Sequence, residues 1–311
     1  MSFDRQVEVL IEQADTQYGL NNYRGAIELL QRALAIDPNH AGAHAWLALA
    51  LLGAHRVPGA AIEVGLALAF DADDPFCHYV AALVAIAQRK LDDAWSHAQV
   101  AMQTDSTNAS YLVAAAAVHE LRGKDDEARA LLREALERDA DHTEALIRMA
   151  RIELEARDHD AAERYAREAL DSDPEDVGAH VIAGLVALVR GDVDKADEHA
   201  RFALNQDSTD RAALELWTSV KARRSPLLGL WWRFTAFVSI RSESGQLGLL
   251  IGSFVVVRLV IILAQHYDLD TLASVLSWAW LGFCAYTWFA PELFKRWLKA
   301  DLGEVRLDPN Y

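Results

Sequence analysis

Residues 109–142 read ASYLVAAAAVHELRGKDDEARALLREALERDADH and contain one copy of a pattern that runs along two thirds of the chain. Two amphipathic helical patterns of about 14 residues are separated by the polar break Arg122-Gly123-Lys124. Six such units follow one another at a spacing of 34 residues, without insertion or deletion, from Val7 to about Gln206. A fixed period of this length predicts a stack of helix hairpins.

Alanine columns carry this repeat. Two columns, seven residues apart, are alanine in every unit: Ala26, Ala60, Ala94, Ala128, Ala162 and Ala196, and then Ala33, Ala67, Ala101, Ala135, Ala169 and Ala203. A third column is aspartate throughout: Asp37, Asp71, Asp105, Asp139, Asp173 and Asp207. Because helices approach closely only where the facing side chains are small, the alanine columns are expected to face the partner helix of each hairpin.

The arrangement resembles the tetratricopeptide repeat family, whose units have 34 residues and small side chains at positions eight, twenty and twenty-seven. With Val7 as position one, position eight holds Ala14, Ala48, Ala82, Ala116, Ala150 and Gly184. The chain departs from the family at position four, where tryptophan is typical and the chain has Leu10, His44, His78, Leu112, Leu146 and His180. The resemblance implies an all-α, right-handed superhelical solenoid of six helix hairpins. Residues 211–224 continue the helical pattern and are expected to cap it, which gives a repeat domain over residues 1–224.

Charge divides the chain near residue 221. Residues 1–220 contain 20 Lys and Arg against 39 Asp and Glu, a net charge of −19, whereas the remainder has a net charge of +3. So acidic a domain repels phosphate backbones, and nucleic acid is not expected as a partner. Cys77 and Cys284 are the only cysteines and lie far apart in the sequence, which argues against a disulfide framework or zinc site and fits a reducing compartment. The first residues lack the pattern of a cleavable signal peptide.

The sequence after residue 224 has the character of a membrane anchor. Residues 225–245 are weakly basic and rich in tryptophan and predict an interfacial amphipathic segment, with a buried helix of the repeat cap as the alternative. Residues 246–290 predict two transmembrane helices, 246–265 and 271–290, each long enough to cross about 30 Å of hydrocarbon. Residues 291–311 predict a juxtamembrane amphipathic tail. Basic flanks and an acidic link favour a bacterial-type inner membrane protein whose repeats and C-terminus are cytoplasmic.

Four residues are predicted to act at or within this membrane segment. Trp231 and Trp232 suit the interface, while Arg258 and Trp278 fall within the two spans. A lone guanidinium near the middle of a span costs about 3 kcal/mol on insertion scales. An antiparallel hairpin would bring Trp278 near Arg258, so a cation–π contact within the chain is one interpretation. A second is that Arg258 meets an acidic residue of another subunit or of a membrane partner, and a third is that the segment is not a true span.

The resemblance further implies a concave binding groove, formed by positions two, five, nine and twelve of each first helix. The residues predicted to bind a partner there are Leu49, Leu52, Phe76, Tyr79, Leu83, Ile86, Val113, Val181, Leu185 and Leu188. The family's dicarboxylate clamp, in which Lys, Asn and Arg grip a chaperone's C-terminal carboxylates, is not matched at positions five and nine. An apolar groove would suit an apolar helix or an extended peptide. For each residue, burial between adjacent helices is the competing interpretation.

No motif favours catalysis. The sequence contains no GxxxxGK[ST], GxGxxG, HExxH or GxSxG, and we predict no catalytic residue, cofactor or metal site. His44, His78 and His180 share one column, but helices one repeat apart stand about 10 Å from each other, too far to share one ion.

The sequence thus predicts a membrane-anchored, non-enzymatic scaffold that recruits a protein through its groove and also contacts lipid; homo-oligomerisation is left open. A structural subunit of a larger membrane enzyme or transport assembly, packed through Arg258, is the alternative. An organelle-surface import receptor is a third hypothesis, which the missing clamp weakens.

Overall fold

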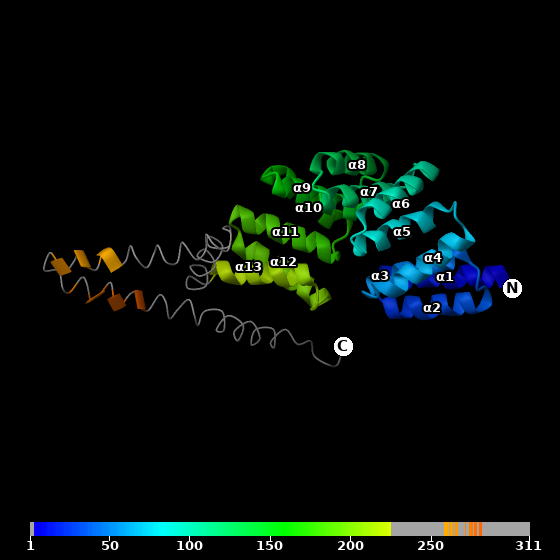
Figure 1. Ribbon diagram of the computed structural model, residues 1–311, viewed down its shortest axis with the longest axis horizontal. Coiled ribbons are helices and arrows are strands. Elements are labelled where there is room, and N and C mark those ends of the chain that lie inside the picture. Colours follow the sequence, from blue (N-terminus) through cyan, green and yellow to red (C-terminus); the bar gives the residue numbers. More distant parts are fainter. Residues whose placement is uncertain are drawn as a thin grey trace. The chain divides into compact units, whose positions relative to one another are not determined.

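The computed structural model describes residues 3–224 and scattered residues between 258 and 281. Residues 3–224 form thirteen α-helices and contain no strand (Figure 1). The helices are α1 (Phe3–Gly19), α2 (Tyr23–Ile36), α3 (Ala41–Gly53), α4 (Val57–Phe70), α5 (Pro75–Ala87), α6 (Leu91–Thr104), α7 (Ala109–Leu121), α8 (Asp125–Arg138), α9 (Thr143–Glu155), α10 (His159–Ser172), α11 (Val177–Arg190), α12 (Val193–Gln206) and α13 (Arg211–Arg224). The predicted all-helical repeat is therefore confirmed.

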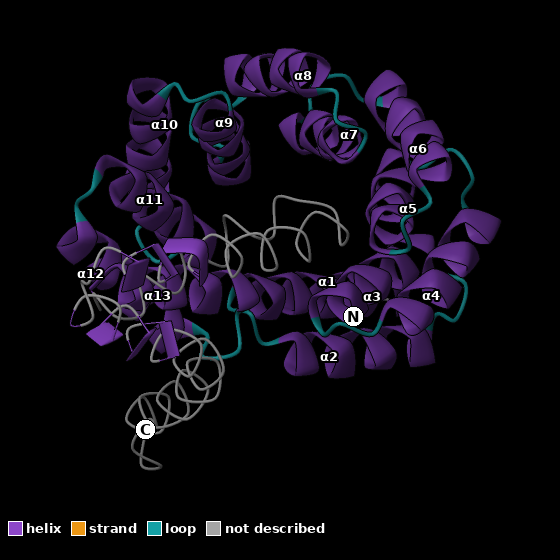
Figure 2. Cartoon of the chain, turned by 60° about the vertical axis from the view of Figure 1, so that its left-hand side comes forward, coloured by secondary structure: helices purple, strands orange, loops and turns teal. Residues whose placement is uncertain are grey.

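The chain divides into two compact units, residues 1–174 and residues 175–311. The first contains α1–α10, and the described helices of the second are α11–α13. Within the first unit each odd-numbered helix packs against the helix that follows it, and α1, α3, α5 and α7 also pack against one another in that order. Figure 2 shows α5 and α7 on one side of this array and α6 and α8 on the other. The first helices of the hairpins thus share one face, and the second helices share the opposite face.

Both alanine columns are fully buried, with an exposed fraction of 0% in all twelve residues. Position eight is equally buried in Ala14, Ala48, Ala82, Ala116 and Ala150. The alanine columns are therefore buried throughout, as close packing of the helices requires. The sixth repeat has Gly184 in place of alanine, because a Cβ there would clash with Cδ2 of Leu216 on α13. Close packing leaves no room for even one additional methyl group.

The predicted breaks within the hairpins share one backbone geometry. A residue with positive φ recurs every 34 residues, at Asn21, His55, Arg89, Gly123, Arg157 and Gly191, with φ between 57° and 88°. The next N–H donates to the carbonyl five residues back, as from Lys124 to His119 at 2.9 Å. This is the Schellman ending of a helix, which satisfies carbonyls that the last turn leaves free. Only two of the six turns use glycine, although the conformation favours it.

The aspartate column shapes most of the links from one hairpin to the next. Each of these aspartates ends a second helix in an extended conformation, with φ between −129° and −141°. Asp37 Oδ1 accepts a hydrogen bond from the N–H of Asn39 at 3.1 Å, and Asp105 Oδ1 accepts both the N–H and the hydroxyl of Thr107. These hydrogen bonds lower the pKa of Asp105. Such side-chain turns hold the chain in place before the next helix starts.

The C-terminal part of the sequence is described only in fragments. α13 covers the residues of the predicted capping helix and buries Leu216, Trp217 and Val220. The predicted interfacial segment (225–245) and tail (291–311) lie outside the described residues, as does most of the predicted hairpin (246–290). In the described part of the chain, no helix combines the length and the apolar character that crossing a membrane requires.

Candidate functional site

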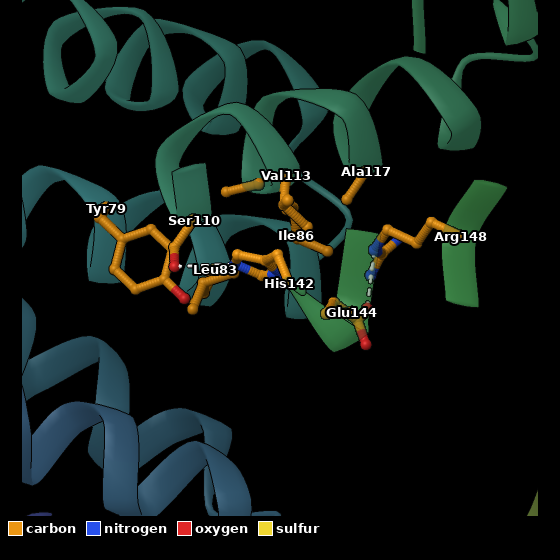
Figure 3. A pocket seen from close by; sticks show the side chains of 10 residues that line it. Tyr79, Leu83, Ile86, Ser110, Val113, Ala117, His142, Glu144 and Arg148 are labelled. Carbon is orange, nitrogen blue, oxygen red and sulfur yellow. Dashed lines mark hydrogen bonds and ion pairs between the residues drawn. The ribbon is translucent and has the colours of Figure 1, made fainter. Parts of the chain in front are cut away.

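A hollow of about 250 Å³ lies in the first unit, where α5, α7 and α9 adjoin (Figure 3). We call it the α5–α9 groove; it is lined by Tyr79, Leu83, Ile86, Ser110, Val113, Ala114, Ala117, His142, Glu144 and Arg148. Its walls along α5 and α7 are mostly apolar, and its charged and histidine side chains come from α9 and its N-cap residue His142. Four of the predicted groove residues, Tyr79, Leu83, Ile86 and Val113, are brought together here.

The α5 wall follows from helical spacing. Tyr79, Leu83 and Ile86 are four and three residues apart and therefore share one face of the helix. All three are half-buried, whereas Val113 of α7 is only 5% exposed and forms the floor. Burial raises the pKa of the Tyr79 phenol to about 12, so this hydroxyl stays protonated at any physiological pH.

His142 and Ser110 make one polar pair in the groove. His142 is the N-cap of α9, and its Nδ1 accepts a hydrogen bond from the Ala145 N–H at 3.3 Å. Nε2 therefore carries the proton and donates it to Oγ of Ser110, 3.1 Å away. Capping thus fixes both the tautomer and the orientation of this ring, and the Ser110 hydroxyl keeps its own proton available for donation.

Arg148 is the centre of a second polar group. Its Nη1 donates to Oε2 of Glu120 at 3.1 Å, and its Nε lies 2.7 Å from Oε1 of Glu144. Burial lowers the pKa of Arg148, but the two carboxylates outweigh it, and the net shift is upward. Burial also raises the pKa of Glu120, whose Oε1 is buried and has no hydrogen-bond partner among the described residues. Arg148 is thus a charge already engaged by two carboxylates.

A row of aromatic rings leads through the first helices to the groove. The rings of Tyr18 and Trp46 lie 6.2 Å apart, those of Trp46 and Phe76 5.1 Å, those of Phe76 and Tyr79 6.2 Å, and those of Tyr79 and Tyr111 5.2 Å. We call these five residues the aromatic row. Such spacings are those of favourable aromatic pairs. The row links α1, α3, α5 and α7 and gives the first unit a continuous aromatic path.

The remaining predicted groove residues lie elsewhere. Leu49 is 7% exposed and Leu52 half-buried, and both belong to the hydrophobic cluster around α1–α5. In the second unit, Val181 and Leu188 are 5% and 7% exposed and Leu185 is half-buried, and all three pack with α12 and α13. Leu49, Val181 and Leu188 are thus buried between helices, which is the interpretation that competes with partner binding.

Sequence reasoning missed the polar lining and part of the aromatic row. Ser110 and Glu144 occupy position two, the column of Phe76. They were not predicted as groove residues because the prediction was limited to apolar side chains. Tyr18 likewise occupies position twelve, so the repeat register was a sufficient signal for these three. Arg148 and Trp46 occupy position six, which the family pattern does not assign to the groove.

The histidines of position four contact the second helix of their own hairpin. His44 Nδ1 lies 2.7 Å from Oε2 of Glu63, and the Nδ1 atoms of His78 and His97 are 3.0 Å apart, as are those of His180 and His199. Each partner follows 19 residues later in the sequence. Among the residues that the structure describes, no three His, Cys, Asp or Glu side chains gather as metal ligands.

The predicted membrane residues are only partly described. Trp231 and Trp232 lie outside the described residues. Arg258 and Trp278 are helical and exposed, Trp278 to 71%.

Comparison with known proteins identifies the repeats. Three models of the family described as tetratricopeptide repeat match residues 18–84, 109–152 and 147–210. No curated protein matches the chain.

Solved structures show the same fold. PilF of Pseudomonas aeruginosa is 19% identical, over 69% of this chain and 98% of that one, with a TM-score of 0.51. A protein of Thermus thermophilus described as a thermophilic TPR protein is 23% identical, over 58% and 99%, with a TM-score of 0.54. The Cut9–Hcn1 assembly of the APC/C gives 13% identity, over 69% and 43%, and a TM-score of 0.58. At these identities the likeness concerns the fold.

Proposed function

Because the chain is a tetratricopeptide repeat protein, we propose that it is a non-enzymatic scaffold that binds a segment of a partner protein in the α5–α9 groove. The observation that carries this proposal is an apolar hollow in which Ser110 is paired with His142 and Glu144 with Arg148. Paired groups hold their positions before a ligand arrives, and this pre-organisation reduces the entropy lost on binding.

The chemistry of the groove favours an apolar side chain. Its volume of about 250 Å³ lies below the range of about 300–1,000 Å³ typical of small-molecule sites, and it is large enough for one large apolar side chain. Arg148 is engaged by Glu120 and Glu144, so the groove does not select a carboxylate. The Ser110 hydroxyl and the Glu144 carboxylate lie within the lining, where they can hydrogen-bond a peptide backbone.

Photocrosslinking in the full chain tests this proposal. We expect p-benzoyl-phenylalanine in place of Tyr79 to label one protein in the native cell, while the same amino acid in place of Arg133, exposed on α8, does not. Leu83→Lys should reduce labelling from position 79 at least tenfold, because it puts a charge into the apolar wall. The matched control is Leu20→Lys, since Leu20 is 70% exposed outside the groove. Equal labelling from positions 79 and 133 would contradict the proposal.

We also propose that the scaffold is held at the bacterial inner membrane by the spans 246–265 and 271–290, with the repeats and the C-terminus in the cytoplasm. The support is the length and apolar character of these two stretches and the basic residues around them. Confinement at a membrane would raise the effective concentration of a weakly bound partner. The full chain should stay in the membrane fraction during alkaline carbonate extraction; release into the supernatant would contradict anchoring.

A structural subunit of a larger membrane assembly is the second candidate function. Arg258 favours it, because a simple anchor needs no charge in the middle of an apolar stretch. Arg258→Leu should then disperse a complex that co-purifies in mild detergent. If the complex survives, the hairpin serves only as an anchor.

A further inference from the structure

Helix α4 (Val57–Phe70) presents an exposed apolar stripe on the face formed by the second helices. Ile62, Leu66 and Phe70 follow one another at intervals of four residues, so they align along the helix. Their exposed fractions are 65%, 39% and 43%. Gly65 and Ala69 lie between them and are also exposed, and the exposed positions of α4 carry no charge.

The other second helices of the first unit expose acidic residues. Examples are Glu28 on α2, Asp92 on α6, Asp126 on α8 and Glu168 on α10. The positions that correspond to the α4 stripe are occupied on α8 by Ala130, Arg133, Glu134, Glu137 and Arg138. The repeat therefore does not require apolar residues here. In a chain of net charge −16, α4 offers a strip without acid.

Gly65 is a second feature of α4 that packing and stability within the helix do not explain. A Cβ at this position would meet nothing within 4 Å, so packing inside the chain does not call for glycine. Glycine in a helix interior is less stable than alanine. A residue without a side chain does allow another helix to approach closely from outside.

We propose that the α4 stripe is the docking site for a second copy of this chain, with the two α4 helices antiparallel across a two-fold axis. A two-fold contact needs a patch that complements itself. If the axis passes between Gly65 and Leu66, Leu66 of each copy faces Gly65 of the other. The same register sets Ile62 against Ala69 and Phe70 against Ala61. Each large side chain then meets a small one.

Charge also favours a second copy over a basic partner. A basic protein would be attracted to acidic surfaces, whereas the one acid of α4, Glu63, is 23% exposed and lies 2.7 Å from His44 Nδ1. Two copies of an acidic chain can meet at α4 without placing like charges opposite each other at the contact. Three large side chains per copy bury far less than the about 1,600 Å² of a standard interface, so the dimer belongs to the weak, concentration-dependent class.

A residue exchange in the full chain tests the register. Two differently tagged copies are co-expressed, one is captured, and the amount of the other is measured. Ile62→Ala removes a large residue and Ala69→Ile sets two large residues against each other, so each should lower capture at least fivefold. The double variant again places a large residue against a small one and should restore capture to within twofold of the wild-type protein.

The matched control is Ala35→Ile, because Ala35 is exposed at the same repeat position on α2. It should leave capture unchanged, and circular dichroism should show the same helical content in every variant. The proposal is overturned if wild-type copies do not capture each other, if the double variant is no better than the weaker single variant, or if Ala35→Ile has the same effect. Labelling from position 79 reports on the α5–α9 groove independently.

Discussion

A pair of histidines makes the stability of the second unit depend on pH. The Nδ1 atoms of His180 and His199 are 3.0 Å apart, and the ring of Phe202 stacks on His180 with centroids 3.8 Å apart. Burial, followed by the charges of His180 and Lys195, lowers the pKa of His199 from 6.5 to about 4. The folded unit therefore favours the neutral ring, whereas the unfolded chain accepts a proton near pH 6.5.

The sign and size of the effect follow from this difference in pKa. Since the folded-state pKa lies below the unfolded value, the stabilisation is complete above about pH 6.5 and is lost as the pH falls toward 4. At about 1.4 kcal/mol per pKa unit, the full shift would correspond to roughly 3 kcal/mol. His199 is only half-buried, so solvent screening reduces the expected loss to about 1–2 kcal/mol.

The assay compares wild-type protein with His199→Tyr, because Tyr165 occupies the same position in the preceding repeat. Hydrogen exchange of residues 193–206 at pH 7 and pH 4.5 gives the opening free energy of α12. We expect the wild-type protein to lose about 1–2 kcal/mol more than the variant over this interval. His55→Asn, at an exposed turn, is the control and should behave as wild type. An equal loss in wild type and His199→Tyr would refute this reasoning.

Three further predictions concern the first unit. Arg89→Gly should raise the free energy of unfolding by about 1 kcal/mol, and Gly123→Ala should lower it by about 1 kcal/mol, because both residues have positive φ. Urea unfolding measures both changes. Changes of the same sign would contradict the turn geometry. Leu132→Ala should cost about 2–5 kcal/mol in the same assay, since Leu132 is fully buried, and a loss under 1 kcal/mol would indicate that the cavity collapses. Arg148→Met should lower the free energy of unfolding by about 2 kcal/mol at pH 7, because it leaves the buried Glu120 carboxylate without its ion-pair partner. The loss should be smaller at pH 5, because the pKa of Glu120 is raised. A loss independent of pH would exclude Glu120 as the cause.

The interior of each hairpin was predictable because its packing depends on position within the repeat. The alanine columns are fully buried and the residues of positive φ recur at the expected breaks. Both features follow from steric constraints inside one hairpin, so they can be seen in the sequence of every repeat. The sequence also located the capping residues of α13, because an apolar face must be covered at the end of a stack.

The lining of the α5–α9 groove was less predictable. The register alone places Tyr79, Leu83 and Ile86 on one face, but the pairing of Arg148 with Glu120 and Glu144 depends on how α7 and α9 are rotated against each other. The contact of His78 with His97 was missed for a related reason, since it depends on the rotation of two helices within one hairpin. Spacing within one helix predicts a face, and contacts between helices require the packed structure.

Positions whose residue differs from one repeat to the next are not fixed by the packing of the hairpin, so their side chains can serve function. Arg148 occupies a column in which other units have Trp46, Val80 and Ala114, and Leu66 occupies one in which α8 has Glu134. Neither departure is required by the hairpin, because units with the other residues adopt the same fold. The first lies on the face of the odd-numbered helices and the second on the face of the even-numbered ones. On these two proposals, a partner in the α5–α9 groove and a second copy on α4 would use opposite faces of the first unit.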